Sequence, residues 1–352
     1  MANLQPQFDT FHARIKLGRF DGEKTLREKR DIIRNKLRDK LPDVFKTHGE
    51  TYPAPVFRDQ GSYDLGTGTK PLDGADYDID QGVYFPVSTE TYRDPVVLKQ
   101  RVYEALDGHT DEVCVRTPCV TVFYHQEGEY VYHVDLAVYS DGPQNADGKA
   151  RLARGRTYST EEHRVWEVSD VQNLADMIFA RFGNANDSDQ FRRMVRYLKR
   201  WRDVNFSSGG NAAPVGIGLT VAASDSFQPH YRDIIAGTPV DLAALHALVD
   251  AMLGRFTWTW DDDGKFVRRL AAHLPVEPRD DPFARMTTGQ MEAFEGKLEV
   301  LRDALNAAAR AVDPIEACET LHSVFGDDFP VPPKEETAKR HIRAISSSSS
   351  SA

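Results

Sequence analysis

Cysteine is scarce in this chain, which contains only Cys114, Cys119 and Cys318 among its 352 residues. Three scattered thiols exclude the disulfide framework of a small secreted domain, and the absence of a Cys-x-x-Cys pair excludes the usual structural zinc site. The chain also lacks any apolar run near the ~20 residues that span a bilayer, and its first residues form no hydrophobic signal segment. We therefore expect a cytoplasmic protein with no membrane partner.

Basic residues are in deficit, because 44 Lys and Arg stand against 54 Asp and Glu, for a formal net charge of −10. Binding to a nucleic-acid backbone depends on clustered cations, so this balance argues against activation by nucleic acid. Residues 24–46 are an exception, with nine basic and four acidic residues, and Leu26, Ile33, Leu37 and Leu41 form an apolar seam at helical spacing. The segment predicts a long surface helix, with a duplex-binding spine as the alternative.

The order of the predicted elements indicates two lobes, which a chain of this length can fill. The long helix should cover 24–41 and stop or kink at Pro42. A mixed α/β segment follows to about residue 139, and a polar, glycine-bearing loop is expected at 142–155. The strands predicted in the α/β segment lie near Ile79, Val113, Val120 and Val131.

From residue 171 the apolar spacing becomes helical, and we expect helices without strands. The predicted helices lie around 174–182 and 191–201 and over 241–256, 264–273, 288–312 and 314–325. The predicted fold class is therefore α+β, with a first lobe at 1–170, an α-helical lobe at 171–335 and a disordered, serine-rich tail at 336–352.

The most specific pattern is the tripeptide Gln60-Gly61-Ser62, followed sixteen residues after Ser62 by Asp78-Ile79-Asp80. Residues two apart on a strand point to the same side, so Asp78 and Asp80 can hold one or two divalent ions, while Ile79 points into a core. Gly61 permits a tight turn, and Ser62 can hold a polyphosphate. This combination suits metal-assisted nucleotidyl transfer.

A third carboxylate is expected on a neighbouring strand, in the stretch 130–139 (YVYHVDLAVY). Asp135 shares one face with His133, while Val134 and Leu136 share the other, apolar face. A carboxylate inside such a strand costs free energy unless a cation or hydrogen bonds compensate it, which favours metal ligation. Each aspartate alone is more typical of a turn or strand edge than of a site, but their conjunction with the Gly-Ser turn points to a site.

These residues resemble the catalytic signature of the polymerase-β-like nucleotidyltransferase superfamily. Gln60-Gly61-Ser62, the longer string 78–84 (DIDQGVY) and the later string 197–203 (YLKRWRD) are similar to the bacterial cGAS/DncV-like nucleotidyltransferases. The similarity runs from about the first helix to Pro333. It implies a bilobal fold, with a polymerase-β-like core of mixed sheet and helices in the first lobe.

The resemblance also implies a site for ATP and GTP between the lobes. Mg²⁺ or Mn²⁺ would be held by Asp78, Asp80 and Asp135, which are the implied catalytic and metal-binding residues. The implied nucleotide-binding residues are Gln60, Gly61, Ser62, Lys199 and Arg116. The family's usual Ser after a Pro at a helix start is missing after Pro214, so that phosphate contact is in doubt.

In this family the product is a cyclic oligonucleotide signal of anti-phage (CBASS) defence, which a downstream effector senses. The resemblance therefore implies a cyclic dinucleotide synthase, such as one for cyclic GMP-AMP. A linear oligoadenylate synthetase, an RNA or small-molecule nucleotidyltransferase and an inactive nucleotide sensor remain alternatives. The tail at 346–352 resembles ends that an E1/E2-like ligase joins to targets, or is a disordered serine tract.

Two further patterns have structural interpretations. Arg192, Arg196, Lys199 and Arg200 lie at helical spacing on one side of a helix, either facing a triphosphate or forming a solvated face. The stretch 258–264 (WTWDDDG) resembles a metal loop but lacks the spacing of a calcium site. We predict that it is a helix end with buried tryptophans and a turn.

Overall fold

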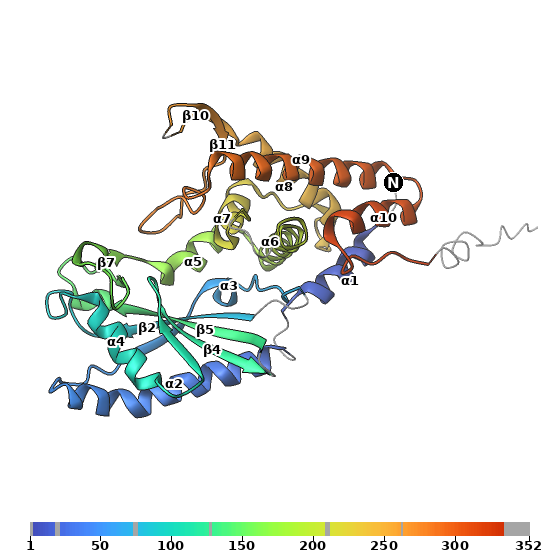
Figure 1. Ribbon diagram of the computed structural model, residues 1–352. Coiled ribbons are helices and arrows are strands. Elements are labelled where there is room, and N and C mark those ends of the chain that lie inside the picture. The colour runs from blue at the N-terminus through green and yellow to red at the C-terminus, as the bar shows by residue number, and fades with distance from the viewer. Residues whose placement is uncertain are drawn as a thin grey trace, which may run out of the picture.

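The computed structural model describes residues 3–17, 22–72, 77–126, 129–207, 212–261 and 263–333. Two main hydrophobic cores divide them into a sheet lobe, between residues 22 and 168, and a helical lobe, which combines 4–15 with 174–329. Leu65 is the exception, since it comes from the first segment and packs in the helical core. The lobes lie one above the other in Figure 1. This architecture confirms the predicted α+β fold class.

A mixed sheet forms the centre of the sheet lobe. Its strands are β1 (Val56–Asp59), β2 (Tyr77–Phe85), β3 (Glu112–Val115), β4 (Val120–Gln126), β5 (Glu129–Ser140), β6 (Arg151–Arg154) and β7 (Val165–Val168). The order is β1-β2-β5-β4-β3, and β6 lies between β5 and β7. Only β2 and β5 run parallel among the described pairs of this sheet.

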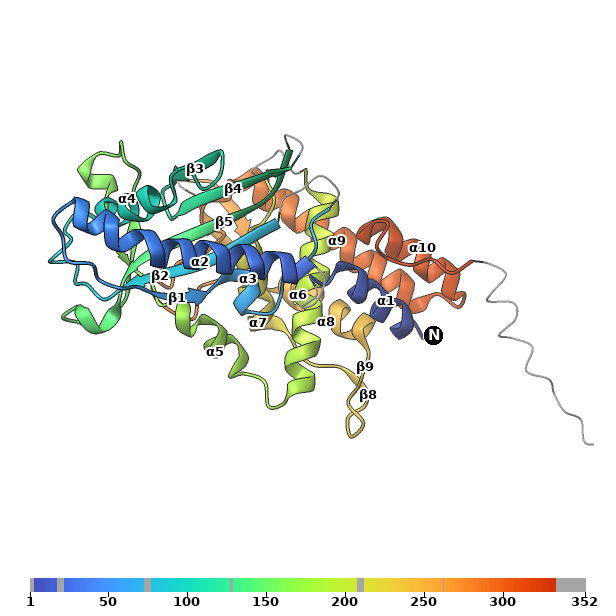
Figure 2. The ribbon, with the colours of Figure 1, turned by 90° about the horizontal axis from the view of Figure 1, so that it is seen from below.

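Helices α2 (Gly22–Thr47) and α4 (Pro95–Leu106) cover one face of this sheet, and Figure 2 shows α2 crossing the strands. The predicted apolar seam is buried at Ile33, Leu37 and Leu41, where it packs with strand residues of the same core. The opposite face of β2 and β5 is left for the helical lobe. It carries the aspartates singled out from the sequence.

Helix α2 continues through Pro42 to Thr47, so the predicted end at about Leu41 is wrong, while the alternative of a kink at Pro42 stays a prediction. A proline in a helix interior removes one hydrogen bond and costs about 3 kcal/mol. Leu41 and Phe45, on either side of Pro42, are both fully buried in the core of the sheet lobe. Burial of these side chains offsets the local cost, which propensity alone does not reveal.

The helical lobe is built around α6. Its helices are α1 (Gln5–Ile15), α5 (Leu174–Phe179), α6 (Ala185–Asn205), α7 (Gly216–Ser226), α8 (Asp241–Gly254), α9 (Thr288–Arg310) and α10 (Pro314–Phe325). Asn184, Thr287 and Asp313 cap the starts of α6, α9 and α10 with side chains that accept backbone N–H groups.

Helix α1 packs in the helical lobe, although the sequence grouped it with the first lobe. The rings of Phe8 and Phe11 lie 5.4 and 5.1 Å from the ring of Tyr197 on α6. Phe11 also contacts Phe325 on α10, at 4.9 Å between ring centroids. The chain therefore begins in one lobe, crosses to the other along α2 and returns at α5.

The helix predicted over 264–273 is wrong, because β10 (Thr257–Trp260) and β11 (Phe266–Arg269) form an antiparallel hairpin there. The tryptophans predicted to be buried are exposed, with relative accessibilities of 57% for Trp258 and 70% for Trp260. Asp261 organises the turn by accepting the backbone N–H of Lys265 at 2.8 Å. The alternation of Thr and Trp is a strand period, which outweighs the helical pattern around it.

Other strands also interrupt regions predicted as loop or helix. Within the predicted loop at 142–155 lie a 3₁₀ turn, Gly142–Gln144, and strand β6. The short strands β8 (Tyr231–Asp233) and β9 (Thr238–Pro239) form a second hairpin in the helical lobe. Strands of two to four residues are too short to show a period in sequence.

The tail at 336–352, with its predicted ligase partner, lies outside the described residues. Among the residues that are described, each helix is too short or too polar to cross a bilayer. The long charged helix α2 is no exception.

We expect Pro42→Ala to stabilise the protein by about 1–2 kcal/mol. The substitution restores one helical N–H and relieves the clash with the preceding turn, less a small loss of unfolded-state restriction. Chemical denaturation followed by circular dichroism measures the change. A lower unfolding midpoint for Pro42→Ala would show that Pro42 is favourable in this helix.

Candidate functional site

The parallel pairing of β2 with β5 brings four polar side chains to one face of the sheet. Asp80 lies opposite Asp135, and Asp78 lies opposite His133, in the same register. Ile79 and Val134 point the other way and are buried in the core of the sheet lobe, as the alternation predicted. Two pairs of potential metal ligands therefore stand side by side.

The Gly-Ser turn lies directly against this face. Gly61 has φ +64°, and a Cβ atom there would lie 1.8 Å from Oδ2 of Asp80. The backbone N–H of Gln60 donates to the carbonyl of Asp80 at 3.3 Å, which ties the turn to β2. Gly61 is therefore required twice, for its left-handed backbone and for the space that the Asp80 carboxylate occupies.

The side chain of Gln60 points into the protein rather than toward the face of the aspartates. Its amide donates to the hydroxyl of Tyr84 at 2.7 Å and accepts from Tyr139 at 3.4 Å. These two tyrosine rings stack 4.3 Å apart, and burial raises the pKa of Tyr139. We therefore restrict the predicted nucleotide contact of this tripeptide to Gly61 and Ser62.

A hydrogen bond from β4 positions the third aspartate. The hydroxyl of Thr121, which is fully buried, donates to Oδ1 of Asp135 at 2.5 Å. The Cys119 sulfur lies 3.5 Å from the same hydroxyl, and burial together with the charge of Asp135 raises the pKa of this thiol to about 12. Cys119 is therefore a neutral neighbour of the site and no nucleophile.

The donor set on this face fits a divalent cation. Ligand atoms of Asp78, His133 and Asp135 all lie within 4.8 Å of one another. Burial, followed by the negative charges of Asp78 and Asp135, raises the pKa of Asp80 to about 7. A bound cation would offset this repulsion, and hard divalent ions prefer carboxylate oxygens.

The cations of α6 do not form a solvated face, since they hold the loop that follows the Gly-Ser turn. Arg192 donates to the carbonyl of Leu65 at 3.3 Å, and Arg196 donates to the carbonyls of Gly66 and Gly68. Lys199 donates to the Thr67 carbonyl at 3.2 Å, and Arg200 donates to the Lys70 carbonyl at 2.7 Å. We call residues 65–70 the clamped loop.

Lys199 also borders a cavity between the lobes. The cavity has a volume of about 540 Å³, and its lining includes Ser62, Asp78, Asp80, Lys199 and Gly216. Burial, and then the charges of Arg202 and Arg196, lower the pKa of Lys199 to about 7. Because Gly216 is the first residue of α7, the free amides of that helix start lie at the cavity wall.

The structure thus brings most of the predicted site residues together. Gly61, Ser62, Asp78, Asp80 and Lys199 line one cavity, and Asp135 adjoins it through its pairing with Asp80. The exposed guanidinium of Arg116 lies over the ring of Phe123, 4.9 Å from the centroid. It does not line either cavity between the lobes in the described part of the chain.

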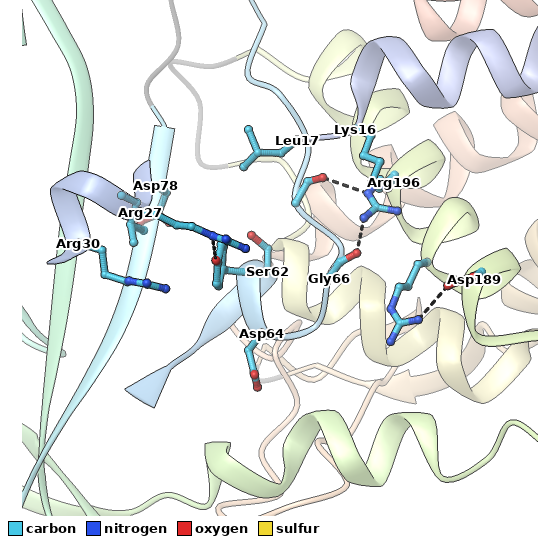
Figure 3. Close-up of a pocket in the computed structure, with 14 residues that line it drawn as sticks. Lys16, Leu17, Arg27, Arg30, Ser62, Asp64, Gly66, Asp78, Asp189 and Arg196 are labelled. Carbon is cyan, nitrogen blue, oxygen red and sulfur yellow. Dashed lines mark hydrogen bonds and ion pairs between the residues drawn. The ribbon is translucent and has the colours of Figure 1, made fainter. Parts of the chain in front are cut away.

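A second cavity of about 380 Å³ lies on the other side of Ser62 and Asp78 (Figure 3). Arg27 and Arg30 of α2 border it, and Arg27 donates to the Tyr63 hydroxyl at 2.8 Å. Arg30 pairs with Asp59 at 3.1 Å. These two basic residues of α2 are therefore engaged within the protein, whereas Arg38 and Lys40 farther along the helix are exposed.

Two residues of the site were missed from the sequence. His133 shares the strand face of Asp135 two residues away, and this spacing was a usable signal. Thr121 gave no signal, because only the pairing of β4 with β5 places it opposite Asp135.

Residues 55–139 match the family model described as cyclic GMP-AMP synthase DncV-like, nucleotidyltransferase domain. This segment contains the Gly-Ser turn and all three aspartates. A curated relative, the cyclic GMP-AMP synthase of Escherichia albertii, is 25% identical over 233 residues, which are 64% of this chain and 47% of the relative. The chain thus matches about half the length of that relative.

Solved structures share the fold over nearly the whole chain. The GTP-bound form of DncV from Vibrio cholerae has a TM-score of 0.69 at 18% identity, covering 93% of this chain and 96% of that chain. DncV from Escherichia coli, bound to 3′-deoxy GTP, has a TM-score of 0.63 at 19% identity, covering 90% and 93%. At these identities the similarity establishes the fold.

We expect Gly61→Ala to weaken divalent-cation binding, because the added methyl group must displace the Asp80 carboxylate. Gly49→Ala is a matched control, since Gly49 has φ +68° and no atom within 4 Å of an added Cβ. Both variants should lose about 1–2 kcal/mol of stability to the left-handed backbone. Calorimetric titration with Mn²⁺ separates the two effects, and equal affinities in the two variants would contradict this account of Gly61.

Proposed function

We propose that this chain, which belongs to the cGAS/DncV-like nucleotidyltransferases, joins ATP and GTP into a cyclic dinucleotide by metal-assisted nucleotidyl transfer. One observation carries the proposal. Asp78, Asp80 and Asp135 converge from two parallel strands beside a cavity that Ser62 and Lys199 also border. Carboxylates that can bind metal ions and a lysine that can bind phosphates thus lie around the same cavity.

Each residue has a role that follows from its position. The three carboxylates would hold Mg²⁺ or Mn²⁺, in one or two sites. A bound divalent ion lowers the pKa of an attacking hydroxyl and offsets charge on a leaving pyrophosphate. Thr121 orients Asp135 through its hydrogen bond, and Gly61 leaves room for Asp80.

Lys199 and Ser62 suit the triphosphate of the nucleotide that donates its α-phosphate. Burial holds the pKa of Lys199 near 7, and a neighbouring triphosphate would favour its charged form. The hydroxyl of Ser62 lies in the same cavity and can donate to a phosphate oxygen. The amides at the start of α7 can replace the serine that is missing after Pro214.

Two successive transfers account for a cyclic product. In each, an acceptor ribose hydroxyl oxygen forms a bond to an α-phosphorus, its proton is lost and pyrophosphate leaves. The first transfer gives a linear dinucleotide, and the second closes the ring. DncV from Vibrio cholerae, a cyclic AMP-GMP synthase, has been captured with the linear intermediate pppA(3′,5′)pG, which supports this order for a chain of the same fold.

The proposed role in the cell is the synthesis of an anti-phage signal that a downstream effector senses. The decisive experiment incubates the purified protein with all four NTPs and Mg²⁺ or Mn²⁺ and identifies phosphatase-resistant products by mass. A cyclic dinucleotide supports the proposal. A linear oligoadenylate would indicate an oligoadenylate synthetase, and a tailed RNA would indicate an RNA nucleotidyltransferase. Nucleotide binding without pyrophosphate release would indicate an inactive sensor.

We expect the double substitution Asp78→Asn, Asp80→Asn to reduce product formation at least about 1,000-fold, because both neutral amides bind divalent cations poorly. The fold should survive, since removal of two mutually repelling carboxylates relieves charge repulsion. Pyrophosphate release measures activity, and thermal unfolding monitors the fold. Full activity in a folded double mutant would refute the metal assignment.

We expect Lys199→Met to lower kcat/KM about 10- to 100-fold, the effect of losing one charged contact of about 1.5–3 kcal/mol. Arg200→Met is the control, because Arg200 also donates to the clamped loop but does not line the cavity. Steady-state kinetics and denaturation of both variants make the comparison. If Lys199 has a purely structural role, Lys199→Met will be destabilised as Arg200→Met is, and its kinetic constants will be unchanged.

A further inference from the structure

We propose that His133 is a nitrogen ligand of the divalent cation in this site. The proposal rests on the proposed function only in assuming that a cation binds at the aspartates. It adds that the donor set combines oxygen with nitrogen, so that the site favours Mn²⁺ or Co²⁺ over Mg²⁺ more than three carboxylates would.

The register of the sheet places His133 among the carboxylates. His133 lies directly opposite Asp78 on the neighbouring parallel strand and two residues before Asp135 on its own strand. Since residues two apart share a face, the imidazole and the Asp135 carboxylate leave the sheet on the same side. His133 and Asp78 form the outer pair of the site, and Asp135 and Asp80 form the inner pair.

The distances suit ligands of one ion. Nε2 of His133 lies 3.3 Å from Oδ1 of Asp78, and ligand atoms of both residues lie within 4.8 Å of one on Asp135. Neighbouring ligands of a six-coordinate ion at about 2.1 Å stand roughly 3 Å apart, and opposite ligands roughly 4 Å apart.

The surroundings hold the imidazole at the mouth of the site. The ring of Phe123 on β4 lies 5.8 Å from the ring of His133, between centroids. The side chain of His133 is 20% exposed, whereas that of Asp78 is 53% exposed. An ion at this outer pair is therefore reachable from solvent while one ligand is fixed by packing.

The chemistry of the donor set decides which ion is preferred. Mg²⁺ takes oxygen ligands almost exclusively, whereas a site that includes a nitrogen ligand binds first-row metal ions with an affinity that rises from Mn²⁺ to Co²⁺. Replacing His133 by Asn exchanges the nitrogen for a neutral oxygen donor of similar reach. The exchange should weaken Mn²⁺ binding at least about tenfold and leave Mg²⁺ binding nearly unchanged.

Pulsed EPR of Mn²⁺ bound to the full chain tests the ligand directly. Three proteins are compared, the wild type, His133→Asn and the control His109→Asn. Each is prepared once with natural-abundance histidine and once with ¹⁵N-labelled histidine. His109 is bonded to the Tyr124 hydroxyl at 2.8 Å and does not belong to the ligand cluster. We expect a nitrogen coupling that changes with the label, persists in His109→Asn and disappears in His133→Asn.

Three results would overturn the proposal: bound Mn²⁺ without histidine coupling, a coupling that survives His133→Asn, or no Mn²⁺ binding at millimolar concentration. The labelled wild-type protein gives an answer even if His133→Asn fails to fold. NTP turnover with Mg²⁺, measured separately, distinguishes this failure from failure of the proposed function. Turnover without histidine coupling would refute only the assignment of His133 as a ligand. Histidine coupling without turnover would refute only the proposed reaction.

Discussion

The parallel pairing of β2 with β5 is the constraint on which the site depends. It places Asp80 opposite Asp135 and Asp78 opposite His133, while the alternate residues fill the core of the sheet lobe. A shift of one residue in this register would turn every ligand toward the core and every core residue toward the cavity. The energy that fixes the ligands therefore comes largely from burial of apolar residues on the opposite face.

A second constraint joins the two lobes. The clamped loop, residues 65–70, leaves the Gly-Ser turn and is held by Arg192, Arg196, Lys199 and Arg200 of α6. Buried cations are costly unless they are compensated, and here backbone carbonyls supply part of the compensation, while Asp189 pairs with Arg192 and Asp328 pairs with Arg200. Lys199 consequently donates to the carbonyl of Thr67 and also lines the interlobe cavity.

Much of this arrangement could be predicted from the sequence, and the exceptions have physical causes. The side-chain faces of β2 and β5 follow from the two-residue period of a strand. The starts of α9 and α10 follow from their capping residues, and both signals are local in sequence. Pro42 and the tryptophans of the β10–β11 hairpin were misjudged because tertiary burial and a four-residue strand decided them. Thr121 and the carbonyl partners of α6 were invisible, since both depend on pairing between distant segments.

The clamped loop has a mechanical consequence. Separating the lobes at this point would expose Arg196, Lys199 and Arg200 together with the carbonyls that they bind, so the contact resists opening. A movement that widens the interlobe cavity and keeps these hydrogen bonds would leave the wall beside Lys199 in place and shift other parts of the wall. The triphosphate of a nucleotide held by Lys199 would thus contact a fixed part of the cavity wall, and the rest of the nucleotide would contact parts that can move.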